Sequence, residues 1–293
     1  MRVDAGPVAC SSAIEASPMT RPTVSVLVPT YNGARHIEAA IDSVLAQTGV
    51  DLEVIVVDDA SADGTAAIAE SCGDSRVRVL RNPTRLGTEG NWNRALELTS
   101  GKYVKLLPQD DLLQPGSLAA QVATLEADTD EAIALVFGAR EIIGPTGRLL
   151  ARRGFRSGAP GRIAAAALAR DCVRRGTNVI GEPGAVLFRR TLAQRVGRFD
   201  GQQGFVIDLD YWIRLLAHGD AWYMAEPVSS FRVSGGSWSV AIGRSQSRQY
   251  TDFITRVTAA GLVSCSRADL AIGKAATRLN TVLRLVFYRM FAR

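Results

Sequence analysis

Short apolar runs alternate with amphipathic stretches through the first half of the chain. Three of these runs, at residues 23–28, 52–57 and 103–107, have the length and apolar density of buried strands. After the first of them, apolar residues recur at helical spacing: Ile37, Ala40, Ile41, Val44 and Leu45. Strands and helices that alternate at such short intervals predict an α/β fold, with a mostly parallel sheet flanked by helices.

Polar side chains follow each of the three predicted strands directly. The clusters are Thr30-Tyr31-Asn32, Asp58-Asp59 and Asp110-Asp111. Because the carboxyl ends of parallel strands meet at one edge of a sheet, we expect the three clusters to converge there. Ligands of open α/β sheets bind in the crevice at that edge, so the sequence predicts a binding site formed by these loops.

Asp110 and Asp111 form a pair of adjacent carboxylates just beyond Pro108. Two ionised acids side by side repel each other, which costs free energy unless a cation lies beside them. A divalent metal is the simplest such cation, since carboxylate oxygens are its usual ligands. The alternative is that one of the two acids caps the helix predicted to begin near Pro115.

Charge and composition narrow the classes of partner. The 293 residues are 47% hydrophobic and 22% charged, which is ordinary for a folded protein with a sizeable core. An excess of arginine gives a formal charge of +5 and indicates anionic partners, either phosphates or a membrane surface. Nucleic acid is not indicated, because no basic run is interleaved with aromatic residues and no binding module is recognisable.

Cysteine spacing and the distribution of apolar residues indicate a cytoplasmic protein. The cysteines lie far apart and do not have the spacing of a metal site: Cys10, Cys72, Cys172 and Cys265. Such cysteines are typical of unpaired thiols in a reducing compartment. No apolar run has the length of a confident transmembrane helix, and the first residues lack the pattern of a secretory signal.

Four motifs, in this order, resemble a known family. They are VSVLVPTYNG, LEVIVVDDASADGT, NPTRLGTEGNWN and LLPQDDLL, and the resemblance covers roughly residues 23–238. The set is similar to the inverting glycosyltransferases of family 2, which have the GT-A fold. The resemblance implies a nucleoside-diphosphate sugar bound at the sheet edge with Mg²⁺ or Mn²⁺. It also implies transfer to a hydroxyl of a glycan, polysaccharide or lipid-linked acceptor, as in polysaccharide or cell-envelope biosynthesis.

The resemblance also implies a domain organisation. Residues 1–21 are rich in small and polar residues and predict a flexible leader. Residues 22–240 correspond to the catalytic domain, with a nucleotide-sugar half at 22–113 and an acceptor half at 114–240. Residues 241–293 predict a helical extension beyond the family pattern.

Several positions match residues with which the family binds its donor. Pro29, Thr30 and Tyr31 match the first nucleotide-contacting loop, and either Asp58 or Asp59 matches the acid that recognises the base. Further matches to donor-contacting positions are Asn91, Asn93, Asp110 and Arg232. For Asp58 and Asp59, helix capping and turn formation are the alternative.

The family's metal motif is Asp-x-Asp-Asp, and in this chain Pro108 replaces its first acid. Asp110 and Asp111 remain as ligands of the metal and the diphosphate. With one carboxylate fewer, we expect metal binding to depend mainly on the donor's diphosphate.

Asp208 matches the family's catalytic base, in the segment that resembles ED-x-D-x-W-x-R, and Ile207 replaces the preceding acid. Asp208 is expected to take the proton of the attacking hydroxyl in a single displacement that inverts the anomeric carbon. A role as helix N-cap is the alternative. On the acceptor side the candidates are Glu182, Trp212 and Trp238; for Glu182, contact with the donor or plain solvation of a loop are equally open.

The tail at residues 269–293 has a helical pattern in which apolar positions alternate with basic ones. The basic residues are Lys274, Arg278, Arg284, Arg289 and Arg293. This composition suits a peripheral helix on anionic lipid at the inner face of the cell membrane. Packing on the catalytic domain or on a second subunit is the alternative.

Two rival functions remain at this point. A sugar nucleotidyltransferase has a similar sheet, but the glycine-rich loop with arginine and lysine that it needs after the first strand is absent, and PTYNG stands there. A non-catalytic nucleotide-sugar-binding protein on the same fold is the other rival, because Pro108 and Ile207 depart from the family pattern.

Overall fold

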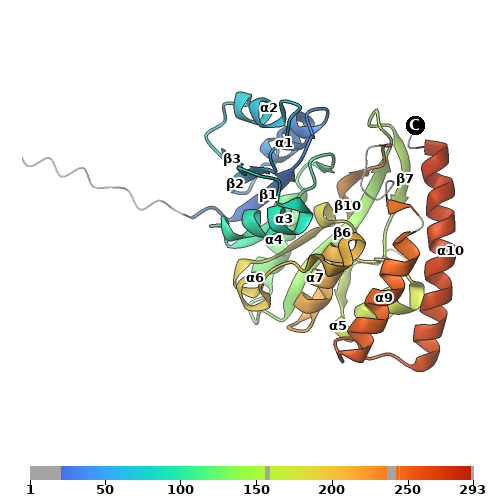
Figure 1. Ribbon diagram of the computed structural model, residues 1–293. Coiled ribbons are helices and arrows are strands. Elements are labelled where there is room, and N and C mark those ends of the chain that lie inside the picture. The colour runs from blue at the N-terminus through green and yellow to red at the C-terminus, as the bar shows by residue number, and fades with distance from the viewer. Residues whose placement is uncertain (1–20, 156–158, 236–241, 244, 292–293) are drawn as a thin grey trace, which may run out of the picture.

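The computed structural model describes residues 21–155, 159–235, 242–243 and 245–291, and a mixed β-sheet runs through them (Figure 1). The strand order across the sheet is β3-β2-β1-β4-β9-β6-β10-β5, with β7 on β6 and β8 on β10. The strands are β1 Val24–Thr30, β2 Leu52–Asp58, β3 Val77–Arg81, β4 Tyr103–Leu106, β5 Leu112–Leu113, β6 Ile133–Ile143, β7 Leu149–Arg153, β8 Gly161–Ile163, β9 Val186–Arg189 and β10 Asp220–Arg232.

The N-terminal half of the sheet is parallel, as the alternating pattern predicts. β1 pairs in parallel with both β2 and β4, and β2 pairs in parallel with β3. In this register Thr30 lies beside Asp58 at the carboxyl ends of β1 and β2. The polar clusters that follow β1, β2 and β4 therefore start from the same edge of the sheet.

The C-terminal half of the sheet mixes strand directions. β9 is antiparallel to its neighbours β4 and β6, whereas β10 is parallel to β6. β6 continues to Ile143 and forms an antiparallel hairpin with β7. Residues 161–163 form β8 and pair with β10, and the helix that follows them begins at Ala165.

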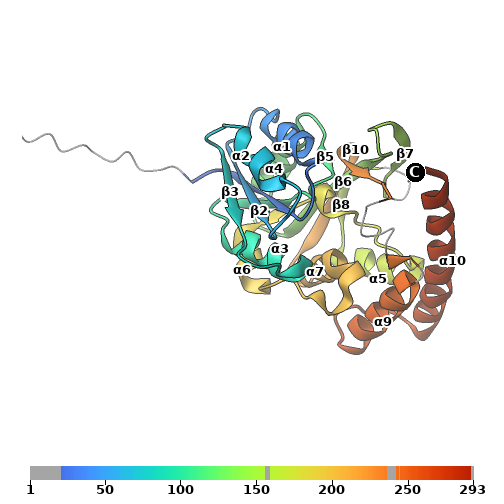
Figure 2. The same cartoon turned by 45° about the horizontal axis from the view of Figure 1, so that its top comes forward.

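Helices cover both faces of the sheet. They are α1 Ile37–Leu45, α2 Thr65–Ser71, α3 Gly87–Glu97, α4 Ser117–Ala127, α5 Ala165–Arg175, α6 Arg190–Val196, α7 Ile207–Leu216, α9 Ser245–Ala259 and α10 Arg267–Phe291, with 3-10 turns η1 Pro183–Ala185 and η2 Gly201–Val206. Figure 2 shows α1, α2 and α4 on one side of the sheet and α3, α6 and α7 on the other. Each side has its own apolar core, formed with α1 and α4 on one face and with α5 and α7 on the other.

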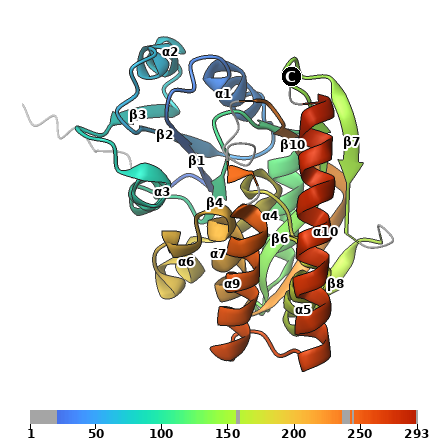
Figure 3. The same ribbon diagram turned by 45° about the vertical axis from the view of Figure 1, so that its right-hand side comes forward.

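The C-terminal helix α10 packs on the body of the protein beside α5 and α9 (Figure 3). Its first turn is held by the buried Asp269, which accepts hydrogen bonds from Arg170 (2.9 Å) and Arg174 (2.7 Å) on α5. Farther along, Gly273 approaches α5 so closely that a Cβ there would lie 2.1 Å from the carbonyl oxygen of Val173. The tail therefore packs on the rest of the protein, which was one of the two alternatives for it, and it does so through small and polar residues.

The outward face of α10 is apolar. Its exposed side chains include Ile272, Leu279, Val282, Leu283, Val286 and Met290. A helix packed on a domain normally buries its apolar stripe and exposes its charges, so the polarity of α10 is reversed. Within the described residues, no helix combines the length and the hydropathy needed to cross a bilayer.

Candidate active site

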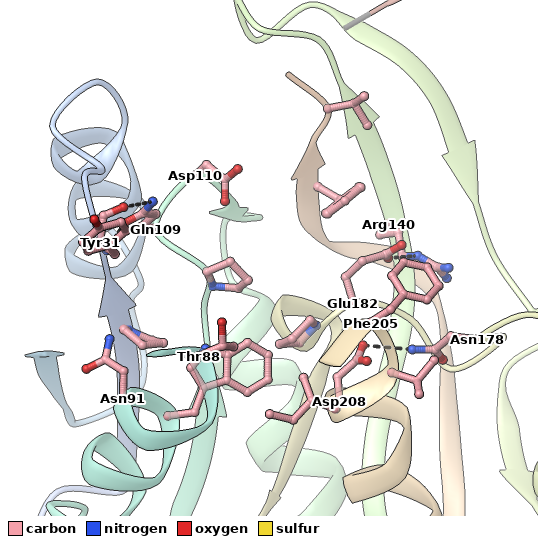
Figure 4. A pocket seen from close by; sticks show the side chains of 18 of the residues that line it. Tyr31, Thr88, Asn91, Gln109, Asp110, Arg140, Asn178, Glu182, Phe205 and Asp208 are labelled. Carbon is pink, nitrogen blue, oxygen red and sulfur yellow. Dashed lines mark hydrogen bonds and ion pairs between the residues drawn. The ribbon is translucent and has the colours of Figure 1, made fainter. Parts of the chain in front are cut away.

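A pocket of about 490 Å³ opens at the carboxyl edge of the parallel strands and extends to α10. One wall contains Pro29, Thr30, Tyr31, Asp59, Asn91 and Asp110, all of them site residues predicted from the sequence. Its opposite wall contains Glu182 and Asp208, together with side chains from β6, β7 and α10. Figure 4 shows the two walls, with Tyr31 and Gln109 on one side and Arg140, Asn178 and Asp208 on the other.

Gln109 joins the loop after β1 to the loop after β4. Its Oε1 accepts hydrogen bonds from the backbone N–H of Tyr31 (2.8 Å) and the hydroxyl of Thr30, and its Nε2 donates to the carbonyl of Tyr31 (3.1 Å). Gly33 leaves room for this contact, because a Cβ there would lie 2.3 Å from Gln109 Oε1. Sequence reasoning missed Gln109, although a polar residue between Pro108 and Asp110 was a signal for it.

Of the two acids after β2, Asp59 lines the pocket and Asp58 does not. Asp59 accepts hydrogen bonds from the backbone N–H groups of Leu86 (2.7 Å) and Gly87 (2.8 Å), and so fixes the start of α3. Asp58 is fully buried, where it accepts from the N–H of Ser61 (3.0 Å). The turn-forming alternative thus describes Asp58, while Asp59 shapes the loop and lies in the wall of the pocket.

Asn91 and Asn93 occupy different environments on α3. Asn91 lines the pocket and donates to the carbonyl of Val57 (3.0 Å), which connects α3 to the end of β2. Asn93 exchanges two hydrogen bonds with the backbone of Phe199 (2.7 and 3.0 Å) and lies outside the pocket wall. Asn93 therefore positions α3 against the segment before η2.

The acid pair after β4 is divided between the pocket and the interior. Asp110 lines the pocket, whereas Asp111 is buried and accepts a hydrogen bond from the backbone N–H of Arg232 (2.9 Å). Burial raises the pKa of Asp111 well above its usual value, and the charges of Asp110 and Glu182 add to the rise. The Arg232 guanidinium donates to the carbonyls of Asp110 (2.9 Å) and Gly144 (3.2 Å) and supports this loop from behind the pocket wall.

The site fits a metal that is shared with a ligand rather than held by the protein alone. Among the described residues, no three acids, histidines or cysteines are grouped closely enough to hold an ion. Asp110 and Asp111 are nevertheless two adjacent carboxylates whose mutual repulsion a cation would relieve. A divalent ion at this position therefore needs further oxygen ligands from a bound molecule.

Asp208 lies on the first turn of α7, facing the pocket. Its Oδ2 accepts a hydrogen bond from Nδ2 of Asn178 (3.0 Å). Desolvation raises the pKa of Asp208 to about 7; the nearby Glu182 adds to the rise, and the hydrogen bonds oppose it. Val206 occupies the N-cap position of α7 and no side chain caps the helix, so the capping alternative does not describe Asp208.

Glu182 lies in the pocket wall and forms an ion pair with Arg140 on β6. Burial acts to raise the pKa of Glu182, but the charges of Arg140 and Arg153 and the hydrogen bonds to the carboxylate together outweigh burial, so the pKa is lowered and the side chain stays ionised. Trp212 is fully buried in the core against Phe188 and is not part of the pocket wall. Trp238, the other aromatic candidate, lies outside the described residues.

The structure adds side chains that sequence reasoning did not assign to the site. They come from the β6–β7 hairpin and from α10: Arg140, Arg153, Arg284, Phe287 and Tyr288. The first two are neighbours only through the pairing of β6 with β7, and the last three reach the pocket only because α10 folds back onto the domain. No local sequence motif encodes either arrangement.

Comparison with known proteins agrees with this architecture. A family model described as glycosyl transferase family 2 matches residues 25–197. The uncharacterised protein MT1568 of Mycobacterium tuberculosis (strain CDC 1551 / Oshkosh) is 34% identical over 226 residues, which span 75% of this chain and 69% of that protein. The UDP-Glc:α-D-GlcNAc-diphosphoundecaprenol β-1,3-glucosyltransferase WfgD of Escherichia coli is 35% identical over 120 residues, or 41% of this chain and 46% of that enzyme.

Solved structures share the fold. S. aureus TarS 1-349 in complex with UDP-GlcNAc matches with a TM-score of 0.64 at 17% identity, over 89% of this chain and 73% of that one. The mannosyltransferase PcManGT from Pyrobaculum calidifontis in complex with GDP-Man and Mn²⁺ matches with a TM-score of 0.59 at 22% identity, over 93% and 74%. The chain therefore belongs to glycosyl transferase family 2: it has the GT-A fold and is a glycosyltransferase.

Proposed function

We propose that the protein transfers a sugar from a nucleoside-diphosphate sugar to an acceptor hydroxyl by a single displacement that inverts the anomeric carbon. The observation that carries this proposal is Asp208, a half-buried carboxylate facing the pocket with a pKa of about 7. A general base works best when its pKa lies near the working pH. Among the described residues that line the pocket, no arrangement requires a covalent intermediate, and one displacement suffices.

The donor binds, in this proposal, against the wall formed by the loops after β1, β2 and β4. Tyr31 offers a flat aromatic surface, with the Arg85 guanidinium 3.9 Å from its ring centre, and Asp59 closes the inner end of the wall. Related folds were solved with UDP, UDP-GlcNAc and GDP-Man. A nucleotide beside Tyr31 and Asp59 directs its diphosphate toward Asp110 and the attached sugar toward Asp208 (Figure 4).

Asp110 is the residue that would hold Mg²⁺ or Mn²⁺ together with the donor's diphosphate, because it lines the pocket, whereas Asp111, the second predicted ligand, is buried behind it. When bound, such an ion stabilises the negative charge of the leaving nucleoside diphosphate. Arg232 contributes by fixing the loop that carries both acids, because its backbone N–H and guanidinium hold Asp111 and the carbonyl of Asp110.

In the transfer step the acceptor oxygen forms a bond to the anomeric carbon as the bond to the diphosphate oxygen breaks. The electron pair of the broken bond leaves with the nucleoside diphosphate, and the acceptor proton passes to a carboxylate oxygen of Asp208. Asn178 holds that carboxylate in place by its hydrogen bond to Oδ2. The charge of Glu182 raises the pKa of Asp208 and so makes it a stronger base.

Contact of α10 with an anionic membrane surface is the second part of the proposal. Exposed apolar side chains cover the outward face of α10, and Arg278 and Arg289 are exposed on the same helix. Asp269, the acid on α10, is buried in its ion pairs with Arg170 and Arg174. An apolar surface flanked by unneutralised basic residues is complementary to an anionic lipid surface.

Incubation with a panel of nucleotide sugars, Mn²⁺ and glycan or lipid-linked acceptors tests the proposed reaction. Release of nucleoside diphosphate coupled to glycoside formation, abolished by EDTA and restored by Mn²⁺, is the expected result. The product must have the opposite anomeric configuration to the donor, which NMR of the new glycoside measures. Release of inorganic pyrophosphate would instead indicate a nucleotidyltransferase, and donor binding without turnover would indicate a non-catalytic protein.

A further inference from the structure

The end of the pocket beyond Asp208 is rich in arginine. Arg140 comes from β6, Arg153 from β7 and Arg284 from α10, and all three line the pocket. Glu182 is the ion-pair partner of Arg140, while no carboxylate of the described residues lies within ion-pair distance of Arg153 or Arg284. Three guanidinium groups and one paired carboxylate leave an excess of positive charge at this end.

The pairing of β6 with β7 places two like charges directly opposite each other. Arg140 and Arg153 are cross-strand partners, so their side chains leave the same face of the hairpin. On the other face the next pair is Glu141 with Arg152, an ordinary ion pair of 3.0 Å. Like charges at opposed positions destabilise a sheet. The pocket face of the hairpin therefore has an unfavourable arrangement that a bound anion would relieve.

Arg284 reaches the same end of the pocket with neutral partners. Its guanidinium donates to Gln246 Oε1 (2.6 Å) and Thr177 Oγ1 (3.4 Å) and lies 5.2 Å from the ring centre of Phe205. These contacts orient the group without neutralising it. Partial burial lowers the pKa of Arg153; Glu182 opposes this effect, and the charges of Arg140 and Arg284 add to it. The guanidinium groups are thus close enough to repel one another.

We propose that this end of the pocket binds a phosphate group carried by the acceptor, with Arg153 and Arg284 as its ligands. The proposal rests on the proposed glycosyl transfer, since it names the acceptor class of that reaction. Guanidinium groups are well suited to phosphate oxygens, to which they donate charge-assisted and often bidentate hydrogen bonds. The acceptor is thus a phosphorylated or diphosphate-linked sugar or polyol, and not a neutral glycan.

The donor's own diphosphate does not account for the arginines. In a single displacement the acceptor attacks from the side opposite the leaving diphosphate, and the base lies with the acceptor. Figure 4 shows Arg140 on the far side of Asp208 from Tyr31 and Gln109, while Asp110 lies on the nearer side. The arginine end is therefore on the acceptor side of the base.

A binding experiment tests the anion site without requiring turnover. Protein saturated with whichever of UDP and GDP it binds, to block the proposed donor side, is titrated with inorganic diphosphate in the absence of metal, and the heat of binding is measured. We expect binding by the wild type, about tenfold weaker binding by Arg153→Gln, which loses one charge-assisted contact, and partial rescue by Arg153→Lys. Arg152→Gln is the matched control, because it removes the same charge from the opposite face of β7. Two results overturn the proposal. One is that diphosphate binds only when no nucleotide is present, and the other is that Arg153→Gln and Arg152→Gln bind diphosphate with equal affinity.

A transfer experiment distinguishes the sources of the phosphate. The acceptors are N-acetylglucosamine diphosphate linked to farnesol, a glycerol phosphate oligomer, and octyl N-acetylglucosaminide, which has no phosphate. Arg153→Gln is expected to lower kcat/KM about tenfold for the phosphate-bearing acceptor that is used, with KM for the donor unchanged. If the octyl glycoside is used as efficiently as the phosphate-bearing acceptors, the phosphate site is wrong, while the proposed glycosyl transfer still stands. Failure to release nucleoside diphosphate from any donor contradicts the proposed function instead.

Discussion

Nδ2 of Asn178 donates a hydrogen bond of 3.0 Å to Oδ2 of Asp208. The orientation of the amide is fixed, because Oδ1 of Asn178 accepts from the backbone N–H groups of Ile180 (3.1 Å) and Gly181 (3.0 Å). Only the NH₂ group is therefore left to face Asp208. A hydrogen-bond donor in this position favours the ionised carboxylate of Asp208 and limits the rise in its pKa that desolvation causes.

Asn178→Ala is expected to raise the pKa of Asp208 further, because the carboxylate loses this donor. Since the base must be ionised to accept a proton, the acid limb of the pH profile of kcat/KM then moves to higher pH. We expect kcat/KM at pH 6.5 to fall about tenfold, with a smaller loss at pH 8.5. Initial rates from pH 5.5 to 9 measure this change. An equal loss at every pH would show that Asn178 supports the fold and does not tune the base.

Asp208 also links stability to pH, and the sign follows from its raised pKa. Between its ordinary value of 3.8 and its folded value of about 7, the folded chain holds a proton that the unfolded chain has lost. The contribution of Asp208 to stability therefore declines as the pH rises through this window. Asp208→Asn removes the half-buried charge, so its Tm should exceed that of the wild type at pH 8 and approach it at pH 5. Asp252→Asn, at an exposed carboxylate on α9, is the control for thermal melts at both pH values. A Tm difference that is the same at both pH values would refute this linkage.

Gln109 is expected to control nucleotide affinity although it carries no charge. Gln109→Ala removes the hydrogen bonds to the backbone of Tyr31 and releases the loop after β1 from the loop that carries Asp110. If the lost hydrogen bonds contribute about 1–2 kcal/mol to holding the loop in the binding conformation, UDP binds roughly five- to thirtyfold more weakly. Calorimetric titration with UDP measures it, with Gln202→Ala, at an exposed glutamine, as the control. Unchanged affinity would mean that the loop is held by other contacts.

Leu283→Glu is expected to weaken binding to vesicles that contain anionic phospholipid, because it places a negative charge in the centre of the outward face of α10. Cosedimentation with anionic and with neutral vesicles measures this effect. Leu86→Glu, at an exposed leucine in the donor half, is the control for added charge. The membrane proposal is contradicted if the wild type does not bind anionic vesicles and elutes as a dimer, while Leu283→Glu elutes as a monomer. The outward face of α10 would then be the contact with a second subunit.

The pocket wall formed by the loops after β1, β2 and β4 was predictable because the carboxyl ends of parallel strands lie at one edge of the sheet. Thr30, Asp59 and Asp110 each follow a recognisable apolar strand, and their convergence required only the α/β pattern. Which acid of each adjacent pair faces the pocket, and which one is buried, was not predictable. Whether Asp58 or Asp59 faces the pocket depends on the path of the turn that β2 enters, and the spacing of the residues does not fix that path.

The opposite wall of the pocket depends on tertiary packing that the sequence pattern does not reveal. The buried face of α10 consists of small and polar residues such as Gly273 and Thr277, so an analysis of apolar periodicity assigns its outward face to the interior. Trp212 illustrates the same limit, because an aromatic residue on a helix suits a sugar site and a core equally well, and the structure buries it. Arg153 became part of the site only through the register of β6 with β7.

The central claim is that Asp208 is the base of an inverting transfer, and one measurement tests it most directly. Asp208→Asn and the wild type are compared for UDP affinity by calorimetry, and for glycoside formation from the donor and acceptor that the wild type uses. We expect the UDP affinity of Asp208→Asn to stay within about twofold of the wild type and its transfer rate to fall at least a hundredfold, the scale of general-base catalysis. Transfer by Asp208→Asn at a rate near that of the wild type would contradict the claim.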